Sequence, residues 1–342
     1  METITVFGAG SWGTALADLA AKRGHDVILW CREEDQARAI NATGRNPRYL
    51  SGASLSPSLN ATGDLEEAAG HSERWVLAIP TQAIREVLNR LVPFSPGSLS
   101  ICNAAKGIEI GSRKLIREIV AEILPEARYS VLSGPSHAEE VIVGQPTAVV
   151  VASSESREAA LWQNLLNGGT FRVYTGTDVV GVEVGGAVKN VMAVAAGVAR
   201  AMGLGDNAVA ALVSRGLAET MRLGARLGAR PLTLAGLAGV GDLMVTCYSH
   251  HSRNFRLGLA LGEGLSLQEA LERLGQVAEG ATTVKAVVAL ARELNVELPL
   301  AEAVHRVLYE SVPPARVLEA LFLRDPKPEL PPALDWENSE KP

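Results

Sequence analysis

Cysteine is scarce in this sequence. Its three cysteines, Cys31, Cys102 and Cys247, are widely separated and odd in number. They have no metal-ligand spacing and form no disulfide framework, so we expect no bound metal and a reducing compartment. The N-terminal stretch METITVFGAG lacks the basic region with which a secretory signal peptide begins, and it runs directly into a strand-like pattern. These features predict a cytoplasmic protein.

An excess of basic residues and a long uncharged apolar run are also absent. The net charge is −6, and both signs of charge are spread along the chain. A nucleic-acid partner is therefore not expected, because it would require a basic patch or stripe. An anionic ligand would have to be held by a few local cations. The longest apolar stretch, 179–202, contains charged residues, whereas a membrane span needs about 20 mostly uncharged ones, so no integral membrane segment is predicted.

The pattern of the chain changes near Asp178. Before it, short β-branched runs alternate with helical segments; after it, helical periodicity recurs with almost no strand signal. The strand-like runs are 4–8, 26–30, 75–79, 98–102, 129–133, 147–153 and 171–175. The helical segments before Asp178 include 13–23, 82–91 and 112–124. Beyond it, the apolar Lys189 segment comes first, and helical periodicity recurs at 208–227, 266–274, 282–294, 300–311 and 315–322.

This alternation predicts an α/β fold in two domains. At 342 residues the chain is too long for one average core. Residues 1–178 are predicted to form a doubly wound, largely parallel sheet covered by helices on both faces. Residues 179–323 are predicted to be all helical, with Asp178 capping the first helix. The proline- and charge-rich residues 324–342 are predicted to be a flexible tail.

A glycine-rich loop, ITVFGAGSWGTALA, follows the first strand and opens a helix. Gly8, Gly10 and Gly13 form a G-x-G-x-x-G pattern. In this context the pattern predicts a dinucleotide site, since glycines let the backbone approach a pyrophosphate at a helix N-terminus. The alternative is a tight turn without a ligand.

The end of the second strand bears on the choice between NAD and NADP. A carboxylate there would bind the ribose 2′-hydroxyl, whereas an arginine accommodates a 2′-phosphate. The sequence ILWCREED offers Arg32, followed by Glu33 and Glu34. We predict NADP as the preferred cofactor with NAD also accepted. A solvated surface role for Arg32 stays open.

Lys189 lies in the middle of an apolar helical segment, VEVGGAVKNVMAVAAGVAR, that looks made for burial. Its helical neighbours include Gly185 and Gly186, which would let a cofactor ring or another backbone approach closely. A lysine in such a place suits proton transfer to or from a carbonyl oxygen. A partly exposed lysine on an amphipathic helix is the structural alternative, but it leaves the two glycines unexplained.

Other polar groups occur where an anionic substrate could bind. Lys106 follows a strand, at the edge where open α/β sheets bind ligands. Asp242 is expected in a glycine-rich turn, and Ser252, Arg253 and Asn254 stand at a probable helix start suited to a phosphate. A plain turn aspartate and a plain capped helix are the alternatives.

Seven segments together resemble the bacterial-type NAD(P)-dependent glycerol-3-phosphate dehydrogenases. They are GAGSWGTALA, AAKGIE, SGPSHAEEV, GQPTAVVVAS, GGAVKNVMAVAAG, GLAGVGDLMVTC and SRNFRLG. The resemblance covers almost the whole chain except the tail. It implies a Rossmann-like first domain, a homodimer, and reversible reduction of dihydroxyacetone phosphate to sn-glycerol 3-phosphate for phospholipid synthesis.

The resemblance also implies roles for single residues. Lys189 matches the proton donor and acceptor, Lys106 a lysine near nicotinamide and substrate, and Asp242 the acid that orients the reacting groups. Implied substrate contacts are Gly134, Ser136, Ser252, Arg253 and Asn254, besides Lys106, Lys189 and Asp242. Implied cofactor contacts are Ser11, Trp12, Arg32, Lys106, Ala138, Arg253, Val277 and Glu279, besides the three loop glycines. His137 departs from the pattern, which has an aromatic residue there.

Two other functions compete with this one. A 6-phosphogluconate or β-hydroxyacid dehydrogenase would share the plan but lack the GLAGVGDLMVTC and SRNFRLG combination. A catalytically silent NADP-binding sensor would lack the complete set of Lys106, Lys189, Asp242 and Arg253. Oxidation of a sugar acid or hydroxyacid would identify the first alternative, and cofactor binding without turnover of any phosphorylated ketose would support the second.

Overall fold

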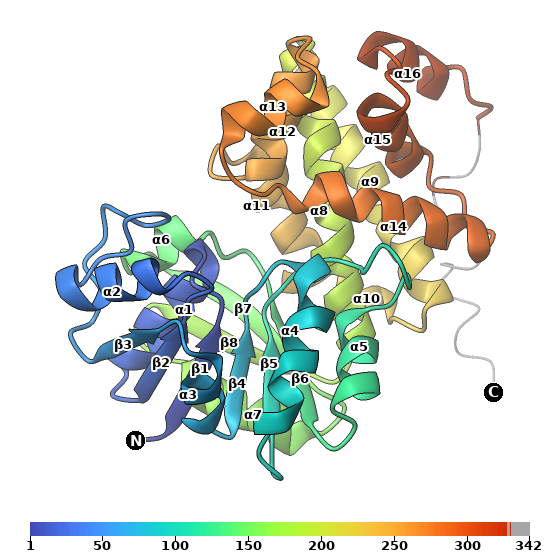
Figure 1. The fold of residues 1–342 in the computed structure, drawn as a ribbon. Helices are drawn as coiled ribbons and strands as arrows, with labels where there is room; N and C mark the ends of the chain where they lie inside the picture. Colours follow the sequence, from blue (N-terminus) through green and yellow to red (C-terminus); the bar gives the residue numbers. More distant parts are fainter. Residues whose placement is uncertain (327–328, 330–342) are drawn as a thin grey trace, which may run out of the picture. The chain divides into compact units, whose positions relative to one another are not determined.

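The first half of the chain is built on an eight-stranded sheet with the order β3-β2-β1-β4-β5-β6-β7-β8 (Figure 1). The structure, a computed structural model, describes residues 1–326 and 329. The strands are β1 (Thr3–Phe7), β2 (Asp26–Trp30), β3 (Leu59–Thr62), β4 (Arg74–Leu77), β5 (Ser100–Asn103), β6 (Arg128–Ser133), β7 (Thr147–Ala152) and β8 (Phe171–Gly176). All neighbours pair in parallel except β6 and β7, which are antiparallel. The prediction of a largely parallel sheet is confirmed.

Helices connect these strands and follow them. In the first half they are α1 (Ser11–Lys22), α2 (Glu34–Thr43), α3 (Leu65–Gly70), α4 (Ile84–Leu91), α5 (Ile116–Ile123), α6 (Ala138–Ile142) and α7 (Ser156–Leu166). The second half contains α8 (Val179–Ala201), α9 (Asp206–Arg226), α10 (Pro231–Leu234), α11 (Asp242–Tyr248), α12 (Arg253–Gly262), α13 (Leu267–Leu274), α14 (Glu279–Glu293), α15 (Pro299–Tyr309) and α16 (Pro314–Phe322). Short 3₁₀ turns occupy Thr81–Ala83 and Val92–Phe94, and a π-helical turn, η3, occupies Leu237–Gly241.

The chain divides into two compact units, Met1–Glu183 and Val184–Pro342. The division falls inside α8, a little beyond the expected boundary at residue 178. Most of the predicted tail, 324–342, lies outside the described residues.

One strand was missing from the sequence prediction. The segment Leu59–Thr62 pairs in parallel with β2 at the edge of the sheet. Its four residues, LNAT, contain neither the run of β-branched side chains nor the length on which strand prediction depends. Its pairing with β2, which is distant in the sequence, supplies what local pattern does not.

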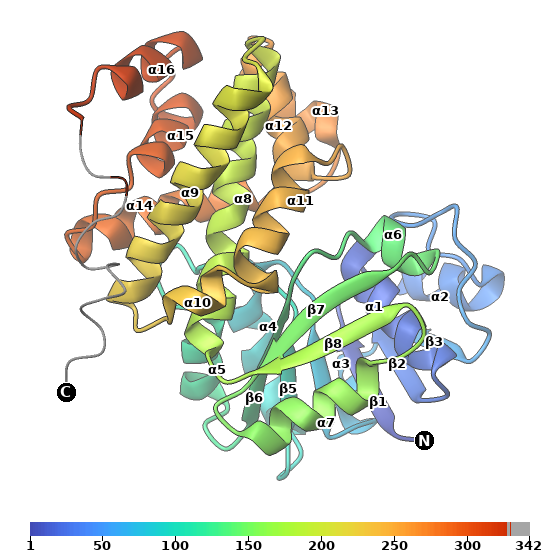
Figure 2. The same ribbon diagram turned by 180° about the vertical axis from the view of Figure 1, so that it is seen from behind.

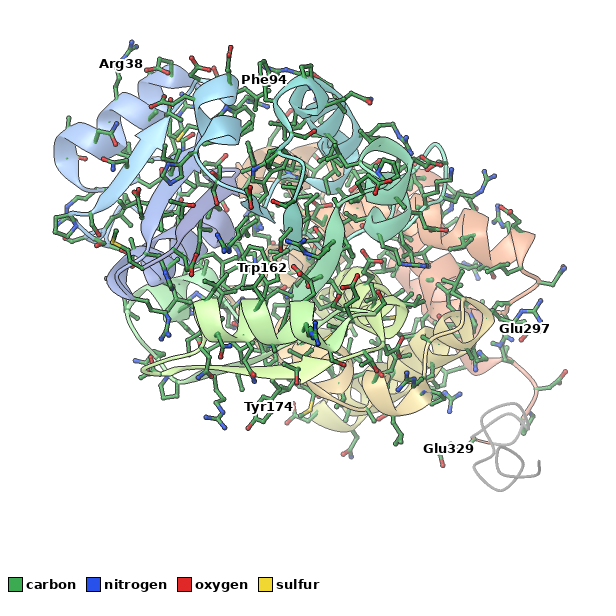
Figure 3. All side chains as sticks on the ribbon, turned by 90° about the horizontal axis from the view of Figure 1, so that it is seen from below. Arg38, Phe94, Trp162, Tyr174, Glu297 and Glu329 are labelled. Atoms are coloured by element: carbon green, nitrogen blue, oxygen red, sulfur yellow. The ribbon has the colours of Figure 1, made fainter. Side chains whose placement is uncertain are left out.

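Helices cover both faces of the sheet. One apolar cluster packs α1, α2, α6 and α7 on one face, with Trp162 fully buried. A second cluster packs α3, α4 and α5 on the other face, with Trp75 fully buried. Figure 3 shows Trp162 inside this unit, whereas Tyr174 of β8 lies at its surface. The first six strands therefore form a doubly wound sheet of the order 3-2-1-4-5-6.

Helix α8 is the central helix of the second unit, and α9 and α12 run alongside it (Figure 2). The Asp178 carboxylate caps it as predicted, because Oδ1 accepts the Gly181 N–H at 2.9 Å. By length and composition, α8 and the stretch Pro231–Tyr248 could each cross a membrane. However, 83% of the apolar window of α8 is buried within the protein, as expected of a core helix. The second stretch is interrupted by the π-helical turn.

Two glycines bring the backbones of α8 and α12 into contact. A Cβ at Gly258 would lie 2.9 Å from the Gly197 Cα, and a Cβ at Gly197 would lie 2.8 Å from the Leu259 nitrogen. Neither position can hold a larger residue without separating the helices. The crossing is therefore set by main-chain atoms.

Candidate active site

The glycine loop connects β1 to α1 at the carboxyl end of the sheet. Gly8 has φ +112°, and a Cβ there would lie 2.6 Å from the Ala78 carbonyl oxygen. A Cβ at Gly13 would overlap the Gly8 carbonyl oxygen, whereas one at Gly10 would meet nothing within 4 Å. Gly8 and Gly13 are thus required by the fold, and Gly10 keeps open the space in front of the helix.

The N-terminus of α1 fits an anionic group. Gly10 is its N-cap and provides no side-chain cap, so the N–H groups of the first turn, which include Ser11 and Trp12, are left for a ligand. The loop lies between β1 and β4, where the strand order reverses, which is the position of the pyrophosphate in dinucleotide-binding sheets. The residues present fit a bound NAD(P).

Arg32 lies just beyond β2 with 82% of its side chain exposed. Its Nε donates to the Glu33 carboxylate at 2.9 Å, a contact that in solvent contributes little stability. The Glu34 carboxylate accepts the Gly63 N–H at 3.0 Å and is held against the backbone. The guanidinium can therefore turn towards a ligand more readily than the Glu34 carboxylate can.

Three predicted substrate residues meet at the ends of β5 and β6. Lys106 Nζ donates to the Gly134 carbonyl oxygen at 3.2 Å, and Ser136 Oγ donates to the same oxygen at 2.9 Å. Gly134 has φ +141°, and a Cβ there would lie 2.9 Å from the Val149 Cα. Only glycine suits that position. Ala138, a predicted cofactor contact, is buried at the start of α6.

Lys189 is buried and paired with Asp242. Its Nζ lies 2.6 Å from Asp242 Oδ1, and the two side chains are 9% and 1% exposed. Thr246 is the third member of the cluster, since its Oγ1 lies 2.9 Å from the same Nζ and 2.5 Å from the Asp242 carbonyl oxygen. Burial raises the pKa of nearby Cys247 to about 12, so that side chain stays a neutral thiol. The structure thus removes the surface-lysine alternative.

Asp242 does not lie in a glycine turn, and that expectation is wrong. The glycine-rich stretch Leu237–Gly241 forms the π-helical turn η3, and Asp242 is the first residue of α11. A Cβ at Gly185 would lie 2.5 Å from the Ala238 carbonyl oxygen, so α8 meets the backbone of this turn. Gly185, four residues before Lys189, therefore allows another backbone to approach closely. This is one of the two roles predicted for the glycines near Lys189. Single π turns often occur at functional sites.

The segment Ser252–Asn254 starts α12, as predicted. Ser252 Oγ caps the helix by accepting the Phe255 N–H at 3.1 Å, and Arg253 is half-buried at the first position. Asn254 instead links three helices: its Nδ2 donates to Asn190 Oδ1 at 2.9 Å and its Oδ1 accepts the Gly280 N–H at 2.8 Å. These bonds explain why an asparagine follows Lys189.

Two predicted cofactor contacts lie near the start of α14. Val277 is 52% exposed and Glu279 is half-buried at the first position of the helix. Their assignment rests on the resemblance.

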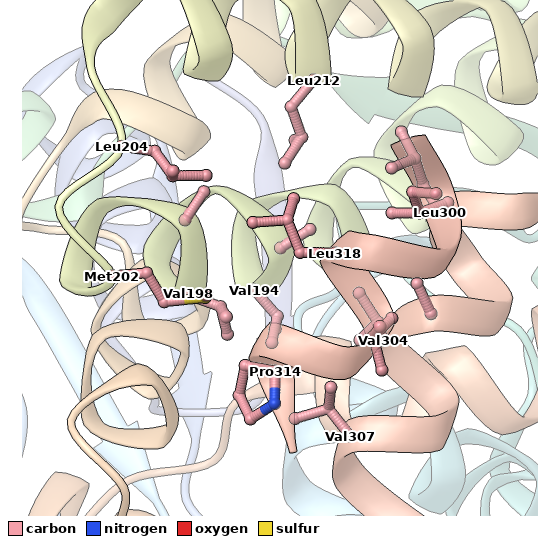
Figure 4. A pocket seen from close by; sticks show the side chains of 15 residues that line it. Val194, Val198, Met202, Leu204, Leu212, Leu300, Val304, Val307, Pro314 and Leu318 are labelled. Carbon is pink, nitrogen blue, oxygen red and sulfur yellow. The ribbon is translucent and has the colours of Figure 1, made fainter. Parts of the chain in front are cut away.

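A pocket of about 60 Å³ in the second unit is not the substrate site. It is lined only by apolar side chains, from Val194 and Met202 at the far end of α8 to Leu212, Leu300 and Leu318 (Figure 4). A phosphorylated substrate needs cations or N–H donors, and this lining has neither.

Thr246 is the site residue that sequence analysis missed. It lies four residues after Asp242, so both face the same side of α11. The i, i+4 spacing can be read from the sequence, but only the structure shows that Lys189 lies beside both side chains.

The strand order and the glycine loop at its reversal are those of NAD(P)-binding Rossmann folds. The second unit adds a buried lysine held by a carboxylate, a suitable arrangement for moving a proton. Together they place the chain in the class of NAD(P)-dependent dehydrogenases.

Comparison with known proteins identifies the family within that class. Residues 3–159 match the N-terminal and residues 178–319 the C-terminal model of NAD-dependent glycerol-3-phosphate dehydrogenase. The chain is 46% identical to glycerol-3-phosphate dehydrogenase (NAD(P)+) of Lysinibacillus sphaericus over 96% of this chain and 98% of that protein. The enzyme of the same name from Geobacillus thermodenitrificans is 49% identical, over 96% of this chain and 97% of that protein. The crystal structure of glycerol-3-phosphate dehydrogenase from Coxiella burnetii superposes with a TM-score of 0.92 at 40% identity, covering 94% of this chain and 99% of that one. The chain belongs to the NAD-dependent glycerol-3-phosphate dehydrogenase family.

Proposed function

We propose that this protein catalyses the reversible reduction of dihydroxyacetone phosphate to sn-glycerol 3-phosphate with NADPH, and with NADH as an alternative. The observation that carries the proposal is the buried cluster of Lys189, Asp242 and Thr246 in a chain of this family. With its pyrophosphate bound at the glycine loop, the dinucleotide would supply the hydride from its reduced nicotinamide. In this proposal the first unit holds the dinucleotide, and the second supplies the proton.

The proton comes from Lys189. As the central carbonyl of the substrate becomes an alkoxide, its oxygen takes a proton from the Lys189 ammonium. Asp242 and Thr246 hold Nζ at 2.6 and 2.9 Å and fix its direction. In the reverse reaction the neutral amine would take the proton of the alcohol.

Local cations offset the charge of the substrate phosphate, because the protein as a whole is negative. We assign this role to Lys106, which Gly134 and Ser136 accompany, and to the start of α12 with Ser252 and Arg253. A helix N-terminus with an arginine suits a phosphate. Asn254 acts by keeping that helix start in register with α8.

The direct test is oxidation of NADPH by the purified protein in the presence of dihydroxyacetone phosphate. Turnover with this substrate, and its reversal with sn-glycerol 3-phosphate, is the expected result. Turnover only with 6-phosphogluconate or a small hydroxyacid would assign the protein to a different dehydrogenase. Cofactor binding without turnover on any of them would indicate a sensor.

Arg32→Ala is expected to lower kcat/KM for NADPH by roughly 10- to 100-fold and to change that for NADH little. A hydrogen-bonded charge pair with the 2′-phosphate accounts for a loss of this size. Steady-state kinetics with both cofactors measure it. Arg38→Ala is the matched control, because Arg38 of α2 points into solvent at the edge of the same unit (Figure 3). Equal losses with both cofactors would count against a 2′-phosphate contact.

We further propose that the enzyme works in the cytoplasm as a homodimer and supplies glycerophospholipid synthesis. The three cysteines are all free and buried, which suits a reducing compartment. The homodimer rests on the family resemblance, and light scattering of the purified protein would test it.

A further inference from the structure

Glu183 is a buried carboxyl group outside the lysine cluster. It is 5% exposed, and its Oε1 accepts the Tyr129 hydroxyl at 2.6 Å and the Arg117 N–H at 3.0 Å. Its Oε2 is buried with no hydrogen-bond partner among the described residues. Packing alone does not require a carboxyl group here, since burying one is costly. The two hydrogen bonds that it accepts therefore suggest that this carboxyl group has a role beyond packing.

Tyr129 extends these contacts to the end of β5. Its ring packs against the cluster on the α3–α5 face of the sheet, and its hydroxyl lies near enough to the Asn103 side chain for the two to interact electrostatically. Asn103 is the last residue of β5, and Tyr129 pairs with Ile101 on the neighbouring strand, so both side chains point to the same face. The hydroxyl thus connects Glu183 of α8 to the residue that ends β5.

Asn103 shapes the loop that carries Lys106. Its Oδ1 accepts the Ala105 N–H at 3.0 Å, and its Nδ2 donates to the Ala105 carbonyl oxygen at 3.2 Å. Lys106 follows directly and donates to Gly134. A displacement of the Asn103 side chain would therefore move the backbone next to Lys106.

We propose that Glu183 and Tyr129 are positioning residues that hold the Asn103–Lys106 loop in its substrate-binding form. The inference rests on the proposed role of Lys106 in binding substrate. Burial raises the pKa of Glu183 to about 7, with the Tyr129 and Arg117 bonds opposing the shift. In either protonation state Oε1 can accept both bonds.

The central experiment is a double-mutant cycle of Tyr129→Phe with Lys106→Ala. Tyr129→Phe removes one hydroxyl and keeps the ring, and it is expected to raise the KM for dihydroxyacetone phosphate about 3- to 10-fold. The dissociation constant for NADPH should stay within about 2-fold, since the glycine loop is untouched. In the Lys106→Ala background, Tyr129→Phe should change KM no further, because the hydroxyl acts through that lysine.

Tyr309→Phe is the matched control. It removes another tyrosine hydroxyl bonded inside the protein, to the Ala281 carbonyl oxygen at 2.5 Å, far along the chain from the loop. Its melting temperature should fall about as much as that of Tyr129→Phe, while its KM stays that of the wild type. Glu183→Gln keeps the acceptor oxygen and should preserve KM, whereas Glu183→Leu should raise it as Tyr129→Phe does.

Four results would overturn the inference. Tyr129→Phe with the wild-type KM, or with a KM effect that persists at full size without Lys106, excludes positioning through Lys106. Equal KM values for Glu183→Gln and Glu183→Leu would show that the hydrogen-bond acceptor at residue 183 has no effect on substrate binding. If Lys106→Ala itself leaves KM unchanged, the role of Lys106 in the proposed function fails and the inference fails with it; turnover of the wild type shows separately whether the reaction is right.

Discussion

Lys189→Ala is expected to lower kcat for dihydroxyacetone phosphate reduction by about 10²- to 10⁴-fold, the usual contribution of a general acid. The dissociation constant for NADPH should change little, because the glycine loop and the start of α1 do not involve this side chain. Burst and steady-state measurements of NADPH oxidation, combined with fluorescence titration of the cofactor, would check both values.

The control is Lys285→Ala, which removes an exposed lysine of α14 that lies over the Tyr309 ring. It should retain the wild-type kcat. Lys189→Met keeps most of the side-chain volume without the charge and should be as inactive as the alanine variant. If kcat and cofactor affinity fell together in the Lys189 variants, the lysine would be structural and the proton would have another source.

Asp242→Ala is expected to reduce the free energy of unfolding by about 3–5 kcal/mol, in addition to a large loss of kcat. The reason is that the Lys189 amine would lose its carboxylate partner in a site where only 9% of its side chain is exposed. Urea denaturation followed by circular dichroism measures the stability, and the m-value shows whether unfolding remains cooperative.

The double variant Lys189→Met with Asp242→Leu separates stability from catalysis. Removing both charges should restore most of the stability lost in Asp242→Ala, because apolar groups of similar size often replace a buried ion pair at little cost. Activity should not return. A double variant as unstable as Asp242→Ala would show that the carboxylate stabilises the start of α11 by some route other than the ion pair.

Much of the fold follows from local pattern. Alternating strands and helices predict the parallel sheet, the glycine loop predicts the position of α1, and Asp178 predicts where α8 starts. Edge strand β3 could not be found in this way, since LNAT has no strand signal before β2 is beside it. The antiparallel direction of β7 could not be predicted either, because a run of β-branched residues indicates a strand but not the direction in which it pairs.

The site was predicted as residue types and not as contacts. Lys189 and Asp242 are 53 residues apart in the chain, and no spacing rule joins them. Asn254 is predicted to contact substrate because it stands at a helix start, but no local pattern shows that its amide also bonds Asn190 and Gly280. The π-helical form of η3 was missed because glycine-rich segments are far more often turns.

The main-chain contact between Gly197 and Gly258 bears on mutational robustness. Helix α8 carries Lys189, and α12 begins with Ser252 and Arg253. Backbone atoms set the separation of the two helices. Substitutions among the large apolar side chains around α8 and α12 can therefore alter stability while Lys189 keeps its distance from the start of α12. The same contact means that the two glycines do not tolerate substitution, because adding even one methyl group to either would push the helices apart.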